Sequence, residues 1–284
     1  MKKYVFVSDM FVENYRGGAE LTTAAIMQNA PPDSQVAKIH SGALTLELVQ
    51  QNLDAHYIVC NFAGLEDNIK VFMCKNADYT IVEYDYKFCE YRSMEKHFVA
   101  TGSECDCVTL IPGKINSAFY GYAKKVWFMS EAQRAIFLEQ IQVLKEENTE
   151  VLSSIFAAGD IAFMKAIKNN EKDDKYLILG SNSWIKGTQD SIEYAKENNI
   201  PYEIVSNLPY HELLIKMSTS KGLIFRPLGS DTCPRIVIEA RLLGCDLIMN
   251  DYVQHKDESW FDNQDTAYDY LESRPEVFWS YYEG

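Results

Sequence analysis

The chain has 284 residues, enough for two domains of ordinary size, with the composition of a globular protein at 47% hydrophobic and 24% charged residues. Its net charge of −14 makes nucleic acid and anionic membrane surfaces poor partners. No apolar run approaches the roughly 18–20 residues of a membrane span, so no transmembrane segment is expected.

Strands and helices alternate along the first half of the chain. β-Branched and aromatic runs bounded by polar breaks predict strands at 4–8, 34–40, 56–60, 79–84 and 125–130. Apolar residues three and four positions apart predict helices at 18–28, 44–52, 65–75, 93–99 and 131–142. Ser130 is the expected N-cap of the last helix.

The second half repeats this rhythm. Strands are predicted at 175–180, 201–206, 222–227 and 245–250, and helices at 187–198, 210–219 and 233–243. The polar stretch 166–175 is the best linker, which predicts domains at 1–168 and 169–284. We expect an α/β protein with two doubly wound, Rossmann-like parallel sheets and a cleft between them. An aromatic final helix at 275–284 either crosses back to the first domain or caps the second.

The cysteines favour reduced, buried thiols in a cytoplasmic protein. There are seven, an odd number, and none forms a C-x-x-C pair. Cys105 and Cys107 in "ECDC" suggest a metal site, but no second ligand pair matches them. No metal is therefore expected.

In parallel α/β sheets, ligands bind where strands end and helices begin. Gly17-Gly18 follow the first strand, and such a pair either lets backbone amides approach a phosphate or only permits a tight turn. Tyr84 and Asp85 end another strand and are candidates to face an acceptor, although aromatic loops often only pack.

Two cations follow strands of the second half. Lys186 precedes Gly187 at a helix start, where a positive charge opposes the helix dipole and favours a ligand phosphate over a solvated lysine. Arg226 lies beside the next loop and is expected to pair with Asp231 or Glu239 or to meet a phosphate.

The stretch "SDTCPRIVIEARLLG" carries two carboxylates. Asp231 precedes a helix predicted to begin near Cys233-Pro234, so it either caps that helix or contacts a ligand. Glu239 lies among apolar residues inside the helix, where a buried carboxylate is costly without partners. A ligand with hydroxyl groups and a solvated helix edge both remain explanations for it.

These residues, in this order, resemble the GT-B glycosyltransferases, and most closely the large retaining glycosyltransferase family 4, which includes sucrose synthases and bacterial mannosyl- and glucosyltransferases. The resemblance covers most of the chain. "RGGAE" is similar to the family's N-terminal glycine loop and "IKG" to its phosphate-contacting turn. The segment from "LPYHELL" to "LLGCDLI" is similar to its donor-binding core.

The resemblance implies a retaining, metal-independent transfer of sugar from a nucleoside diphosphate sugar, with no other cofactor. Glu239 would bind the ribose, Lys186 with Gly17 and Gly18 the diphosphate, and the base would lie near Leu208. The sugar would contact Asp231, Thr232, Cys233 and Pro234, and Asp231 and Lys186 would be the catalytic residues. The acceptor would be a glycan or a small molecule.

Three departures from the family pattern keep other functions open. Asp231 stands where the family has glutamate, Ser181 stands where it has arginine, and "EYDY" stands near the place of its strand-end histidine. A non-catalytic GT-B-like protein that binds a nucleotide or glycan is the first alternative. A nucleotide-sugar epimerase or a phosphorylase of the same fold is the second.

Overall fold

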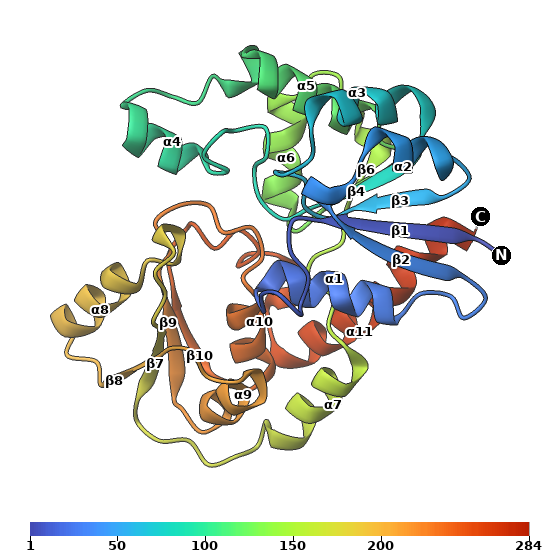
Figure 1. Ribbon diagram of the computed structural model, residues 1–284. Helices are drawn as coiled ribbons and strands as arrows, with labels where there is room; N and C mark the ends of the chain where they lie inside the picture. Colours follow the sequence, from blue (N-terminus) through green and yellow to red (C-terminus); the bar gives the residue numbers. More distant parts are fainter. Residues whose placement is uncertain (284) are drawn as a thin grey trace. The chain divides into compact units, whose positions relative to one another are not determined.

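The computed structural model describes residues 1–283, which divide into two compact units (Figure 1). The first unit combines Met1–Ile155 with the chain end from Arg274, and the second is Phe156–Ser273. This division lies ahead of the predicted boundary at 168/169 because helix α7 (Ala158–Ile167) packs on α9 (Tyr210–Ser218) and α10 (Arg235–Leu242). None of the helices within residues 1–283 is long and apolar enough to cross a membrane.

The first unit is built on a six-stranded parallel sheet in the order β2-β1-β3-β4-β5-β6. Its strands are β1 (Lys3–Ser8), β2 (Gln35–His40), β3 (His56–Val59), β4 (Asp78–Glu83), β5 (Val126–Phe128) and β6 (Thr149–Val151). Tyr4 of β1 is in register with His56 of β3 on one side and with Val36 of β2 on the other. The chain therefore winds outward in both directions from β1, as expected for a doubly wound sheet.

Helices cover both faces of this sheet. They are α1 (Gly18–Gln28), α2 (Leu46–Gln51), α3 (Asp67–Asn76), α4 (Met94–Thr101), α5 (Ile111–Tyr122) and α6 (Glu131–Gln140). Side chains alternate along β1, so Val7 enters the core shared with α3, α5 and α6, whereas Tyr4 and Phe6 face the opposite side. That side meets Trp279, whose indole N–H donates to the Ile26 carbonyl of α1 at 3.0 Å.

The second unit has a four-stranded parallel sheet in the order β10-β9-β7-β8. Its strands are β7 (Tyr176–Leu179), β8 (Tyr202–Val205), β9 (Gly222–Phe225) and β10 (Asp246–Met249). Besides α7, α9 and α10, it contains α8 (Thr188–Glu197) and the first part of α11 (Gln264–Glu283). Strand β9 is buried along its whole length, as its unbroken apolar sequence predicts for a central parallel strand.

Short 3-10 turns connect these elements. They are η1 (Ser41–Ala43), η2 (Cys107–Thr109), η3 (Glu146–Asn148), η4 (Trp184–Lys186) and η5 (Ser259–Phe261). The expected N-cap is confirmed, since the Ser130 hydroxyl accepts the Gln133 amide, and the Ser93 hydroxyl likewise accepts the Lys96 amide at the start of α4.

The predicted α/β fold with two parallel sheets is confirmed, with additions. Helices α5 and α7 and the three-residue strand β6 were not predicted. The helix predicted at 275–284 is the end of a longer helix that begins at Gln264 and continues through Pro275. Its aromatic end belongs to the first unit, where Trp279 packs edge-on against Tyr4 and the Tyr282 hydroxyl lies 2.7 Å from that of Thr80.

Candidate functional site

Asp231 lies in the loop between β9 and α10, and a neighbouring segment fixes its backbone. Its amide donates to the Tyr252 carbonyl at 2.9 Å, and its carbonyl accepts the Gln254 amide at 3.2 Å. Helix α10 begins at Arg235 after Pro234, and no side chain caps its first turn. The capping explanation for Asp231 is therefore wrong, and its carboxylate binds a different group.

Lys186 supplies that group. Its ammonium nitrogen lies 2.7 Å from Asp231 Oδ2, and it also sits over the Phe225 ring at 5.7 Å from the centroid. The lysine ends η4, and Gly187 turns the chain into α8 with a left-handed φ of 58°. A Cβ at Gly187 would lie 1.8 Å from the Arg226 carbonyl, so only glycine lets this turn approach β9 so closely.

The exposure of this ion pair suits ligand binding. The Lys186 side chain is 30% exposed, whereas that of Asp231 is 11% exposed and largely buried, so solvent reaches the ammonium more than the carboxylate. An ammonium that reaches solvent can also contact a ligand phosphate.

Glu239 is buried in α10 at 2% exposure, so it is not on a solvated helix edge. The Tyr210 hydroxyl donates to its Oε1 at 2.8 Å, and Arg235 Nε approaches the same oxygen at 3.5 Å. Burial raises the pKa of the Glu239 carboxyl, and Arg235 and Tyr210 partly offset this effect. The Arg235 guanidinium in turn stacks over the Phe156 ring at 3.8 Å.

The remaining predicted donor residues of this unit surround the same loop and helix. Thr232 and Cys233 are buried between Asp231 and Pro234, and Leu208 is exposed between β8 and α9. Arg226 takes a different partner from those expected. Its Nε donates to Asp190 Oδ2 at 2.7 Å, and its guanidinium lies 4.4 Å from the centroid of the Tyr194 ring. It is thus anchored to α8 and paired with neither Asp231 nor Glu239.

In the first unit, Gly17 caps α1 and Gly18 begins it. The Glu20 carboxylate folds back on this helix start, and backbone hydrogen bonds from Glu20 and Gly17 partly offset the burial that raises its pKa. A carboxylate at a helix N-terminus occupies the position that suits an anion. Phosphate contact by Gly17 and Gly18 stays a prediction.

Tyr84 and Asp85 follow β4 within a dense polar network. The Tyr84 hydroxyl lies 2.8 Å from Thr23 Oγ1, and Asp85 pairs with Lys87 at 3.1 Å and with Arg92. Burial acts to raise the pKa of Asp85, but these cations outweigh it and the pKa is lowered. Their role toward an acceptor stays a prediction.

Sequence reasoning missed Glu83 in this network. It is fully buried, pairs with Lys87 at 2.8 Å and accepts from the Tyr120 hydroxyl, and burial raises its pKa to about 7. Glu83 ends strand β4 and Lys87 lies in the loop that follows, so the helical rule for residues four positions apart does not predict this pair.

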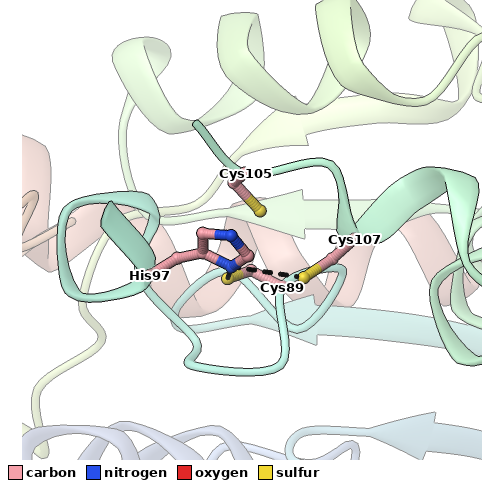
Figure 2. Close-up of side chains that lie close together, drawn as sticks. All are labelled: Cys89, His97, Cys105 and Cys107. Carbon is pink, nitrogen blue, oxygen red and sulfur yellow. Dashed lines mark hydrogen bonds between the residues drawn. The ribbon is translucent and has the colours of Figure 1, made fainter. Parts of the chain in front are cut away.

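A group of possible metal ligands assembles in the same unit. Cys89 and His97 approach Cys105 and Cys107, and the four ligand atoms lie within 4.8 Å of one another (Figure 2). The sequence showed only the Cys105–Cys107 pair, because the other two ligands come from a turn and from α4.

Comparisons with known proteins identify the fold. No protein-family model matches this sequence, and no curated protein matches it. Solved structures do match: HepE of Anabaena in complex with UDP and glucose aligns over 98% of this chain and 94% of its own, at 11% identity and a TM-score of 0.55. Trehalose-6-phosphate synthase OtsA aligns over 96% and 91%, at 10% identity and a TM-score of 0.60.

A third neighbour is AviGT4, a glycosyltransferase involved in avilamycin A biosynthesis, which aligns over 98% of this chain and 93% of its own at 12% identity and a TM-score of 0.54. Each match covers nearly all of this chain and nearly all of the matched chain. They confirm the predicted resemblance to GT-B glycosyltransferases in fold, and the activity must be argued from the residues.

Proposed function

We propose that the chain is a retaining glycosyltransferase that moves a sugar from a nucleoside diphosphate sugar to an acceptor. One observation carries the proposal: a single loop and helix present two carboxylates in different settings. Asp231 is held on a fixed loop and paired with Lys186, whereas Glu239 is buried in α10 beside Tyr210 and Arg235. The neighbours in fold, among them HepE with UDP and glucose, support a donor of this class.

The two carboxylates suit opposite ends of such a donor. We assign Glu239 to the ribose hydroxyls, because a buried carboxylate that already has a cation and a phenol beside it is held ready to accept hydrogen bonds. We assign Lys186 to the diphosphate and Asp231, with the buried Thr232–Pro234 backbone, to the sugar. The nucleobase lies toward Leu208.

In the reaction, the bond between the anomeric carbon and the phosphate oxygen breaks, and a bond from the acceptor oxygen to that carbon forms on the same face. The acceptor proton passes to the departing diphosphate. Lys186 stabilises the negative charge that develops there, since an ammonium is worth most where charge appears in the transition state. We propose that no metal ion takes part in this step and that the enzyme works in the cytoplasm.

The test is to incubate the chain with a panel of nucleoside diphosphate sugars and acceptors in buffer without Mg²⁺ or Mn²⁺. We expect nucleotide release, a product whose anomeric configuration by NMR matches that of the donor, and loss of turnover in Asp231→Asn with donor binding kept. Release that needs an added divalent ion would overturn the metal-independent step. A product of inverted configuration would overturn retention.

One observation favours a second function, donor binding without transfer. Arg226, which was expected to pair with one of the two carboxylates or to meet a phosphate, is held by Asp190 and leaves Lys186 as the cation beside Asp231. Binding of a donor with no turnover on any acceptor would support this function. An epimerase would instead interconvert sugar nucleotides without an acceptor, and product analysis of the same incubations detects that outcome.

A further inference from the structure

The segment between β4 and α5, residues 84–110, gathers four side chains that bind soft metal ions. They are Cys89 in a turn, His97 in α4, Cys105 in the following loop and Cys107 at the start of η2. Figure 2 shows the three sulfurs and the imidazole pointing toward one another. All four come from one continuous stretch with the spacing C-x7-H-x7-C-x-C.

The distances suit a tetrahedral ion. The Sγ atoms of Cys107 and Cys89 lie 3.5 and 3.9 Å from His97 Nδ1, and all four ligand atoms lie within 4.8 Å of one another. A tetrahedron with zinc bond lengths needs about 3.6 Å between sulfur and nitrogen and about 3.8 Å between sulfurs. A small contraction of the group therefore reaches this geometry, whereas a cluster containing several iron atoms needs ligands farther apart.

The surroundings hold these ligands in place. The Cys89 thiol donates to the Ser93 carbonyl at 3.4 Å, and Tyr91 packs edge-on against the His97 ring at 5.4 Å. Helix α5 packs closely against the backbone of η2: a Cβ added at Gly113 would lie 1.9 Å from the Cys107 carbonyl oxygen. Cys89, His97 and Cys107 are thus each held by a neighbouring group outside the cluster.

Ordinary hydrophobic packing does not account for this arrangement. His97 is the one fully buried residue of α4, at 6% exposure, while Phe98 and Val99 of the same helix are 55% and 69% exposed. A helix anchored by apolar contacts would bury its phenylalanine and valine and expose its histidine. Here α4 instead turns its imidazole inward to meet three thiols.

We propose that Cys89, His97, Cys105 and Cys107 bind one zinc ion. Three thiolates and an imidazole match the ligand sets of structural zinc sites, and four protein ligands leave no open position for a substrate. The ion fastens α4, η2 and the turn at Cys89 together, and so shapes the segment that follows Glu83. Cysteine binds zinc as the thiolate, so zinc binding at this site releases protons.

The test uses the full-length chain and does not depend on the proposed transferase activity. After growth with zinc and gel filtration, elemental analysis and native mass spectrometry should find stoichiometric zinc in the natural protein. Cys74→Ser, which removes a half-buried cysteine of the same unit outside the cluster, should keep it. Cys107→Ser and His97→Ala should lose it.

A second measurement on the natural sequence decides the case if those variants fail to fold. Replacement of zinc by Co²⁺ should give the visible absorption of a tetrahedral cobalt thiolate, and removal of metal should raise hydrogen exchange mainly within residues 84–113. Three outcomes would overturn the proposal. In the first, the chain holds no metal after zinc loading and its thiols react equally fast with and without zinc. In the second, the mass of the chain is lower by two hydrogens because two of these cysteines form a disulfide, and in the third the chain binds iron together with sulfide.

Discussion

At the scale of single residues, the two carboxylates of the candidate donor site differ in what holds them. Asp231 is fixed through its backbone, by Tyr252 and Gln254, so its side chain is left to pair with Lys186. Glu239 is fixed through its side chain, by Tyr210 and Arg235. A ligand group that replaces Asp231 as the partner of Lys186 disturbs no backbone contact.

Replacement of Lys186 by methionine should weaken binding of a nucleoside diphosphate roughly 10- to 100-fold, because a charge-assisted hydrogen bond contributes about 1.5–3 kcal/mol. Binding of the matching nucleoside, which has no phosphate, should not change. Calorimetric titration measures both. Lys196→Met, which removes an exposed lysine from nearby α8, is the control. Equal diphosphate affinity in Lys186→Met and the natural protein would contradict the assignment.

The residues of this site were predictable from the sequence, but their pairing was not. Lys186 and Asp231 stand between strand ends and helix starts, where ligands bind in a parallel α/β sheet, and Glu239 lies inside the helix that follows Asp231. The pairing of Lys186 with Asp231 joins residues 45 positions apart, and no local pattern encodes it. By contrast, the contact between Arg235 and Glu239 could be predicted, because residues four positions apart on one helix face each other.

At the scale of elements, the turn from η4 into α8 positions Lys186. Gly187→Ala places a methyl group against the Arg226 carbonyl at a left-handed φ of 58°, so it should lower the free energy of unfolding of the second unit by at least about 1–3 kcal/mol. Denaturant unfolding measures the loss. Gly159→Ala in α7 is the matched control, since its Cβ meets nothing within 4 Å and should stabilise the helix slightly.

The end of α11 contributes its aromatic side chains to the first unit. Trp279→Ala should remove about 3–5 kcal/mol of stability and raise hydrogen exchange in β1 and α1, because Trp279 packs on Tyr4 and donates to Ile26. Trp260→Ala, which removes a ring stacked on His255 and Tyr270, should instead raise exchange within the second unit. Increased exchange in the second unit alone after Trp279→Ala would contradict this assignment.

The elements that sequence reasoning missed share a weak local signal. Helix α5 has proline as its second residue and contains two glycines, which is typical of a loop, and tertiary packing against η2 and α3 overrides that tendency. Strand β6 has three residues and is defined by its pairing with β5. The buried strands were predicted because each is a run of mainly β-branched and aromatic residues bounded by polar breaks.

At the scale of the whole molecule, the boundary between the two units does not lie in the polar stretch that was predicted to be the linker. The charged stretch 166–175 marked the predicted boundary, yet α7 lies ahead of it and joins the second unit. Polarity identifies exposed chain, whereas a boundary between units depends on which partner a helix packs against, and that information is not local.

Each unit contains a histidine whose neutral form is favoured, half-buried His56 in the first and fully buried His255 in the second. Burial lowers the pKa of His56 to about 4 in the first unit and that of His255 to about 3 in the second. In the unfolded chain both titrate near 6.5, so below that pH the unfolded state binds more protons than the folded state. Stability should therefore be fully present above about pH 6.5 and fall as the pH falls, by up to about 1.4 kcal/mol per pH unit for each histidine.

Unfolding free energies measured between pH 7 and 4 test this dependence. His255→Phe, which keeps a ring among Trp260 and Phe261, should flatten the pH dependence of the second unit and leave that of the first unchanged. His56→Gln should do the reverse. Parallel pH curves for the natural protein and both variants would contradict the neutral assignment of these histidines.

Calorimetric titration of the natural chain with a panel of nucleoside diphosphate sugars, compared with Glu239→Gln, tests the central claim most directly. The account predicts one saturable site for at least one donor, with affinity at least roughly tenfold weaker in Glu239→Gln and unchanged in Glu193→Gln, an exposed glutamate of α8. Absence of binding to every nucleotide, or equal affinity in a folded Glu239→Gln chain, would contradict it.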